Sequence, residues 1–198
     1  MSCDFVVFDL ETTGLSPRYH EIIQIAGTRM RNGTVVTRDS FFSYVRPEGP
    51  ISSFITAYTG ISTRDVANAP PICKVLAAFS EYVGEAVLIA HNGQRFDAKF
   101  LWAACEQKQL KARPVELIDS IYFSKRLFGS TRGTGHGLDV VLARMKVAIS
   151  NRRRHDARGD VSGLAQAVER MWRKLNLDAT CSGIPRAQTL LPKPSVQR

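Results

Sequence analysis

Two carboxylates, Asp9 and Glu11, stand two residues apart directly after the apolar run at residues 5–8. Alternate residues of a β-strand project from the same face, so a strand here would present both carboxylates together. Burying two such groups on an apolar strand is costly unless a cation or hydrogen-bond donors compensate them. A lone D-x-E pattern is common, and a solvated strand end capped by Thr12 and Thr13 explains it as well.

A second polar cluster, H-N-G-Q-R-F-D at residues 91–97, joins an apolar run to a segment with helical spacing. Asp97 falls in the first turn of that helix, where the helix dipole favours a carboxylate, so helix capping alone could account for it. His91 and Asn92 could likewise fix the loop through hydrogen bonds.

A third cluster, H-D-A-R-G-D at residues 155–160, stands at the start of the last predicted helix and follows three arginines. Asp156 could simply cap this helix, with the arginines forming a charged helix start. His155 and Asp160 are five residues apart, which allows a common site although they do not share a helical face.

Taken together, the three clusters resemble the motifs of the DEDDh, DnaQ-like exonuclease family, which has a ribonuclease-H-like fold. The family patterns are D-x-E-T-T-G, H-N-x-x-x-[FY]-D and H-x-A-x-x-D, and all three occur here in order. The segment Y-T-G-I-S at 58–62 stands where the family often has H-G-I-T. The resemblance covers roughly residues 4–175. It departs from the family in Gly159, which weakens the start of the last helix, and in Val161, where Ala is usual.

The resemblance implies a metal-dependent 3′-5′ exonuclease. Two divalent cations, Mg²⁺ or Mn²⁺, would be held by Asp9, Glu11, Asp97 and Asp160, and oxygen ligands without nearby Cys suit such hard ions. Asp9 would bridge both ions, and Asp97 would hold the second mainly through water. His155 would be the general base, because its ordinary pKa of about 6.5 allows proton uptake near neutral pH. Cleavage would release nucleoside 5′-monophosphates.

Substrate contacts are implied around this centre and along a basic stretch. The chain has 27 Lys+Arg and 18 Asp+Glu, a net charge of +9. Most of this excess lies between residue 146 and the C-terminus, which favours a nucleic-acid backbone as partner. A solvated loop is the competing explanation for the arginines. The expected substrate contacts are Thr12, Thr13, Leu15, Ile61, His91, Asn92, Arg152, Arg153 and Arg154.

The leading hypothesis is hydrolysis at single-stranded or frayed 3′ ends of DNA. An alternative is an exoribonuclease acting on RNA or short oligoribonucleotides, which depends on recognition of the terminal 2′-hydroxyl. A non-catalytic nucleic-acid-binding module is the alternative of another class. The presence of all four acids and the histidine argues against it, since buried negative charge facing a phosphate would weaken a binder.

The surrounding sequence predicts an α/β fold, with a mixed β-sheet flanked by helices. Apolar, β-branched runs predict strands at residues 5–10, 22–31 and 34–45, and Asn32-Gly33 predicts a hairpin between the last two. These three strands would be antiparallel, and strands at 87–90 and 115–119 would then add in parallel, alternating with helices. Helices are expected near 63–66 and at 71–82, 96–110, 120–128, 138–146 and 156–175.

We expect an exonuclease domain at residues 1–177 and a flexible C-terminal tail at 178–198, whose Pro- and Ser-rich composition lacks periodicity. The tail could bind a protein partner. Four widely spaced cysteines suggest neither a zinc site nor a disulfide framework. No leader or membrane segment is apparent, so we expect an intracellular protein, cytoplasmic or nuclear.

Overall fold

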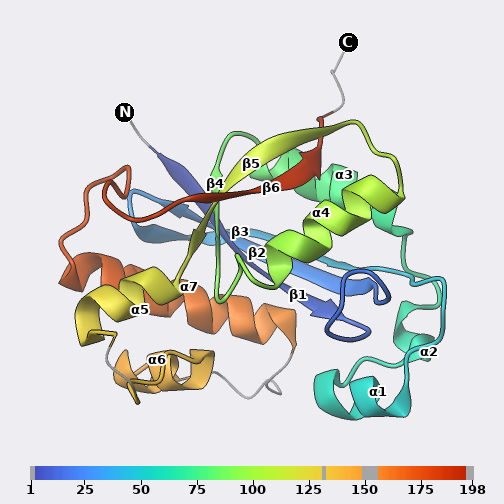
Figure 1. The fold of residues 1–198 in the computed structure, drawn as a ribbon, viewed down its shortest axis with the longest axis horizontal. Coiled ribbons are helices and arrows are strands. Elements are labelled where there is room, and N and C mark those ends of the chain that lie inside the picture. Colours follow the sequence, from blue (N-terminus) through green and yellow to red (C-terminus); the bar gives the residue numbers. More distant parts are fainter. Residues whose placement is uncertain (1–2, 131–132, 149–155, 195–198) are drawn as a thin grey trace.

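The computed structural model describes residues 3–130, 133–148 and 156–194. Within these residues a six-stranded sheet has the order β3-β2-β1-β4-β5-β6 (Figure 1). Its strands are β1 Asp4–Thr12, β2 Ile22–Arg31, β3 Thr34–Tyr44, β4 Val87–Ala90, β5 Ala112–Asp119 and β6 Ala187–Pro192. The first three strands pair antiparallel, and β4 and β5 then add in parallel. The predicted mixed sheet is therefore confirmed.

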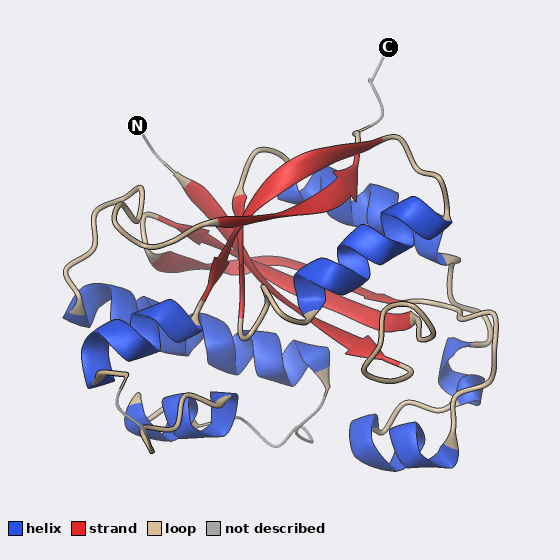
Figure 2. Cartoon of the chain, viewed as in Figure 1, coloured by secondary structure: helices blue, strands red, loops and turns tan. Residues whose placement is uncertain are grey.

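Helices cover both faces of this sheet (Figure 2). They are α1 Ser53–Thr59, α2 Thr63–Val66, α3 Ile72–Val83, α4 Asp97–Gln107, α5 Ile121–Phe128, α6 Leu138–Arg144 and α7 Ala157–Lys174. The helices α3 and α4 pack on one face, and α5, α6 and α7 pack on the other. Among the described residues, no helix has the length and apolar character needed to cross a membrane.

Strand β1 is buried on both faces, and its alternation decides where the first motif points. Val6 and Phe8 pack with α3 and α4, whereas residues 5 and 7 belong to the core beneath α5, α6 and α7. Because side chains alternate along a strand, Asp9 and Glu11 continue the series that faces α7. The pleat of one central strand thus directs both carboxylates to the same helix.

The predicted hairpin is confirmed at Asn32-Gly33, where both residues have positive φ, 49° and 76°. Such a turn matches the right-handed twist of β2 and β3. Glycine is required at position 33 for a second reason: a Cβ there would lie 2.5 Å from the ring of Trp172.

Two elements differ from the prediction. Helix α1 was not expected, and the proposed flexible tail is wrong over residues 187–192, which form β6 against β5. Leu191 is fully buried in the core, and the Thr189 hydroxyl donates to the Ala98 carbonyl at 2.7 Å. The flanking prolines gave this segment the composition of a loop, yet an edge strand tolerates Pro because one side of its backbone needs no partner. A protein partner bound at this segment stays a prediction.

The burial of β6 predicts how stability responds to substitution. Leu191→Ala should lower the free energy of unfolding by about 2–5 kcal/mol, because it opens a cavity beneath the sheet edge. The neighbouring exposed side chain provides the control, and Gln188→Ala should change stability by no more than about 0.5 kcal/mol. Urea denaturation followed by circular dichroism measures both. A flexible tail would make the two substitutions equally harmless.

Candidate active site

Three carboxylates from distant parts of the chain converge at the end of β1. Asp9, Glu11 and Asp160 each offer an oxygen, and these oxygens lie within 4.8 Å of one another. Glu11 and Asp160 are buried, whereas Asp9 is partly exposed. Three negative charges this close repel one another strongly wherever the surroundings exclude water. A positive charge bound among these carboxylates would therefore lower the electrostatic energy of the site.

Asp160 is brought to the cluster by the first turn of α7. Asp156 is the N-cap of this helix, and its side chain accepts from the backbone N–H of Arg158 at 3.0 Å. The Arg158 guanidinium also donates to Asp156 at 2.8 Å and lies over the ring of Phe42. Asp156 therefore caps this helix, as the capping explanation of the third cluster predicted. The capped turn also positions Asp160, which lies one turn into the helix.

Gln24 of β2 joins this helix start to the sheet. It stands directly opposite Glu11 in the β1–β2 register and is fully buried. Its Oε1 accepts from the backbone N–H of Ala157 at 2.8 Å. Ala157 also packs with Ala26 and Val161 in a small buried cluster, where short side chains allow close approach. The sequence analysis missed Gln24, although a lone amide in the apolar run I-I-Q-I-A was an available signal.

Asp97 lies at the first turn of α4 and is buried, as its position in the second motif required. Burial raises the pKa of Asp97 to about 7, and the negative charge of Asp119 adds to this increase. The nearby backbone N–H groups of Leu10 and Asp97 lower it in part. The contact with Leu10 places this carboxylate beside the residue between Asp9 and Glu11. Among the described residues, Asp97 Oδ1 has no hydrogen-bond partner.

The loop between β4 and α4 is held by Asp119 at the end of β5. Its Oδ1 accepts from the backbone N–H groups of Asn92 and Ile121, each at 3.0 Å. His91 Nδ1 lies 2.8 Å from the Ser120 hydroxyl. His91 and Asn92 thus fix the loop, and their contact with substrate stays a prediction.

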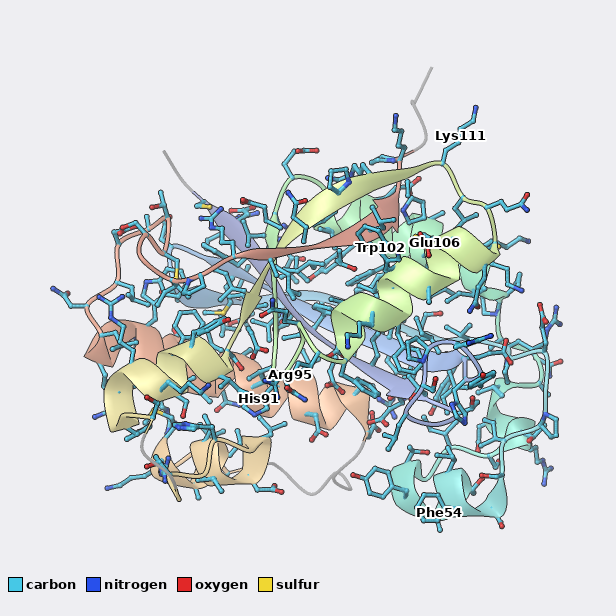
Figure 3. The ribbon with its side chains drawn as sticks, in the orientation of Figure 1. Phe54, His91, Arg95, Trp102, Glu106 and Lys111 are labelled. Carbon is cyan, nitrogen blue, oxygen red and sulfur yellow. The ribbon has the colours of Figure 1, made fainter. Side chains whose placement is uncertain are left out.

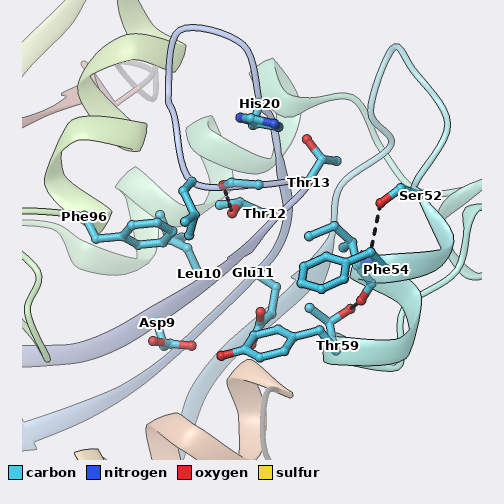
Figure 4. Close-up of a pocket in the computed structure, with 14 residues that line it drawn as sticks. Asp9, Leu10, Glu11, Thr12, Thr13, His20, Ser52, Phe54, Thr59 and Phe96 are labelled. Atoms are coloured by element: carbon cyan, nitrogen blue, oxygen red, sulfur yellow. Dashed lines mark hydrogen bonds between the residues drawn. The ribbon is translucent and has the colours of Figure 1, made fainter. Parts of the chain in front are cut away.

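A pocket of about 760 Å³ opens beside the carboxylates and is lined by Asp9, Glu11, Thr12 and Thr13 (Figure 4). The Thr12 hydroxyl donates to the Gly14 carbonyl at 2.6 Å, and the Thr13 hydroxyl accepts from the Glu21 N–H at 2.9 Å. Both predicted threonines therefore shape the loop that borders the pocket.

The mouth of this pocket is apolar and exposed. Three of its lining residues are exposed: Leu15 is 84% exposed, and Phe54 and Tyr58 of α1 are 74% and 53% exposed. The two rings are parallel to within 7°, with centroids 6.5 Å apart. Ile61, in contrast, is only 3% exposed, and it packs beneath α1 and α2 instead of lining the pocket. Its contact with a base stays a prediction, and the aromatic wall of α1 was missed together with the helix itself.

Four predicted site residues, Arg152, Arg153, Arg154 and His155, lie outside the described residues. His155 immediately precedes Asp156, the N-cap of α7, so the chain connects it directly to the helix that carries Asp160.

The donor set fits hard divalent cations. The converging ligands are carboxylate oxygens, which Mg²⁺ and Mn²⁺ prefer, and the group found in the described residues includes no sulfur or imidazole ligand. Asp97 adds a fourth carboxylate whose buried Oδ1 lacks a hydrogen-bond partner within the described part of the chain. A bound cation would offset the charge repulsion and the desolvation together.

Comparison with known proteins identifies the family. The exonuclease family model RNase_T matches residues 6–168. The chain is 37% identical over 162 residues to the DNA polymerase III PolC-type of Latilactobacillus sakei subsp. sakei (strain 23K), covering 82% of this chain and 11% of that protein. It is 38% identical over 147 residues to the same protein of Streptococcus thermophilus (strain ATCC BAA-491 / LMD-9), covering 74% and 10%. The chain thus spans about a tenth of the length of these relatives.

Solved structures share the fold. The nuclease domain of 3′hExo, a DEDDh family member, bound to rAMP, matches with a TM-score of 0.74 at 22% identity, covering 86% of this chain and 92% of that one. Exonuclease X in complex with 5′ overhanging duplex DNA matches with a TM-score of 0.70 at 24% identity, covering 88% and 95%. With its three motifs in family order and its acids gathered at one sheet edge, the chain belongs to the exonuclease family that the RNase_T model describes, and it shares the fold of a DEDDh family member.

Proposed function

We propose that this domain hydrolyses single-stranded or frayed 3′ ends of DNA in the presence of Mg²⁺ or Mn²⁺ and releases nucleoside 5′-monophosphates. The observation that carries the proposal is the convergence of Asp9, Glu11 and Asp160 beside an open pocket that Asp9 and Glu11 line. A module that only bound nucleic acid would gain nothing from three carboxylates facing a phosphate, because their charges repel it.

In this proposal Asp9, Glu11 and Asp160 would hold one cation, and Asp97 would help to hold a second. When bound, the two ions supply positive charge to the attacking and leaving oxygens of a displacement at phosphorus. His155 accepts the proton of the attacking water, a role suited to an imidazole near neutral pH.

The aromatic wall supports a preference for unpaired ends. Phe54, Tyr58 and Leu15, which all line the pocket, would hold the terminal base by stacking and apolar contact. Base–aromatic stacking contributes about 1–3 kcal/mol per base. A terminal base must leave its neighbours in the duplex before side chains can cover its faces, so a frayed or single-stranded end binds at the lowest cost.

Support for DNA comes from the relatives above 30% identity, which are DNA polymerases of the PolC type. The matched region is only about a tenth of the length of those proteins, so the proposal extends only to the chemistry of the domain. Hydrolysis of RNA is the competing outcome of the experiment below.

The first test is degradation of a 5′-labelled and a 3′-labelled oligodeoxynucleotide with Mg²⁺. Wild type should shorten the 5′-labelled strand in a ladder and release the 3′ label at once as a mononucleotide. Asp9→Asn should reduce kcat about 100-fold or more, because loss of a cation ligand removes several kcal/mol of transition-state stabilisation. His155→Ala should also reduce kcat strongly.

The control for this test is Glu85→Gln, which removes a carboxylate from an exposed site away from the pocket and should leave the rate unchanged. A matched RNA strand should be degraded more slowly than the DNA strand. Undiminished degradation in EDTA, or full activity of Asp9→Asn, would show that the proposed centre is wrong. Faster hydrolysis of RNA than of DNA would show that RNA is the substrate, and the proposed hydrolytic mechanism would still hold.

Cation binding has its own readout in thermal unfolding. At a Mn²⁺ concentration about 100 times its dissociation constant, binding stabilises the folded protein by about 2.7 kcal/mol. This should raise Tm by roughly 5–10 °C for a chain of this size. Asp9→Asn and Asp160→Asn should lose most of that increase, whereas Glu85→Gln should keep it. Equal increases in all four proteins would mean that Mn²⁺ binds elsewhere.

A further inference from the structure

A second pocket, of about 530 Å³, adjoins the same loop that carries Asp97. We call it the α5 pocket and define it by His91, Arg95, Tyr122, Lys125 and His136. Figure 3 shows His91 and Arg95 close together, between α4 and α5. Phe96, the next residue after Arg95, lines the catalytic pocket instead. The loop at residues 91–97 therefore separates the two pockets.

The walls of the α5 pocket are preformed. His91 Nδ1 lies 2.8 Å from the Ser120 hydroxyl at the start of α5, and His136 Nδ1 lies 2.8 Å from the Ser124 hydroxyl one turn later. Both serines are fully buried, so they hold the rings against a rigid helix. A pocket whose walls are already fixed loses little conformational entropy when a ligand binds.

The charge of this pocket favours an anion. Arg95 and Lys125 are exposed, and neither forms a salt bridge with any residue that the structure describes. Asp119 is the acidic residue of the lining, and its Oδ1 accepts from two backbone N–H groups, those of Asn92 and Ile121. Two free cations thus face one carboxylate that is already engaged in holding the loop.

The position of the pocket indicates which anion. Strands β1, β4 and β5 are parallel, so their carboxyl ends meet at one edge of the sheet. Along that edge Asp9 and Glu11 lie in the carboxyl-terminal half of β1, the 91–97 loop follows β4, and α5 follows β5. A strand whose 3′-terminal nucleotide occupies the catalytic pocket can cross this loop and reach Arg95 and Lys125 with its upstream phosphates.

We propose that the α5 pocket binds the phosphodiester backbone of the substrate strand, upstream of the terminal nucleotide, through Arg95 and Lys125. The inference rests on the proposed function for the direction of the strand. Its consequence is that the pocket contributes to affinity for oligonucleotides and leaves the hydrolysis of a single nucleotide ester unchanged.

The test compares a substrate that has upstream phosphates with one that lacks them. For Arg95→Ala and Lys125→Ala, KM for a single-stranded 20-mer should rise about three- to tenfold each. The hydrolysis of thymidine 5′-monophosphate p-nitrophenyl ester should stay within twofold of wild type. The matched control is Lys111→Ala, which removes the same charge at the beginning of β5, far from the carboxyl end, and should change neither substrate.

Binding is measured separately by fluorescence anisotropy of the labelled 20-mer in EDTA. Each variant should reduce the slope of log Kd against log salt concentration by about 0.7, the value for one phosphate contact on a single strand. Unchanged slopes, or the same loss in Lys111→Ala, would overturn the inference. Equal losses on the ester and the 20-mer would also overturn it. Failure of wild type to hydrolyse either substrate would contradict the proposed function, while the anisotropy would still decide the role of the pocket.

A second inference concerns Gln24, and it depends on separate observations. Gln24 is opposite Glu11 on β2, and its Oε1 accepts from the Ala157 N–H in the first turn of α7. This hydrogen bond joins the strand beside Glu11 to the helix that carries Asp160. We infer that Gln24 is a positioning residue, which holds Asp160 at the distance from Glu11 that cation binding requires.

The test uses substitutions that distinguish the loss of the Gln24 hydrogen-bond acceptor from a change in side-chain volume. Gln24→Met keeps the volume and removes the acceptor, so the dissociation constant for Mn²⁺, measured by electron paramagnetic resonance, should rise about tenfold or more. Gln24→Glu retains an oxygen that accepts from the same N–H, and it should bind Mn²⁺ at least as tightly as wild type. The acceptor is therefore tested by the loss of affinity in Gln24→Met, and Gln24→Glu shows that the site tolerates a polar side chain of this size.

The stability control is Ser80→Ala, which removes another buried hydrogen bond, from the Ser80 hydroxyl to the Pro192 carbonyl. It should lower Tm and leave the affinity for Mn²⁺ unchanged. Wild-type affinity in Gln24→Met, or an equal loss of affinity in Ser80→Ala, would refute a positioning role.

Discussion

The arrangement of this domain depends on a concentration of negative charge that the fold itself creates. Asp9 and Glu11 continue the side of β1 that faces α7, and Asp160 approaches them from that helix. Carboxylates so close together and partly removed from water destabilise the fold unless a cation joins them. The pKa of Asp97 is raised for a related reason, since burial and the neighbouring carboxylate of Asp119 both disfavour its charge. A bound cation would therefore stabilise the fold by relieving this repulsion, in addition to its role in the proposed chemistry.

Each acid is held by an element with a different source of rigidity. Asp9 and Glu11 stand on a central strand with hydrogen-bonded neighbours on both sides. Asp160 depends on the first turn of α7, which Asp156 caps and which the amide of Gln24 fastens to β2. Asp97 follows a loop that Asp119 holds through backbone N–H groups. A site built from three segments needs these separate fastenings, because carboxylate positions that shift by an ångström no longer share a cation.

The hydrogen-bonding groups that hold the 91–97 loop also determine which residues of the loop line each pocket. The hydrogen bonds that fix the 91–97 loop also leave Phe96 in one pocket and Arg95 in the other. The side of the loop facing the carboxylates is apolar and aromatic, as suits a base. The other side carries Arg95 and Lys125, which form no salt bridge within the described part of the chain, as suits a phosphate. One loop can thus present two kinds of surface to successive parts of a nucleic-acid strand.

The sequence by itself determined the central strands, the hairpin at Asn32-Gly33 and the identity of the acids, because strand alternation, turn chemistry and motif order are local properties. Only the tertiary structure decided that Gln24 fastens α7, that α1 supplies an aromatic wall, and that residues 187–192 form an edge strand. Gln24 accepts from a residue 133 positions away and β6 pairs with the distant β5, so no local pattern records either partner. The roles of the Gln24 amide, the α1 rings and β6 follow from the residues that the fold places next to them, and these neighbours are distant in the sequence or belong to another element.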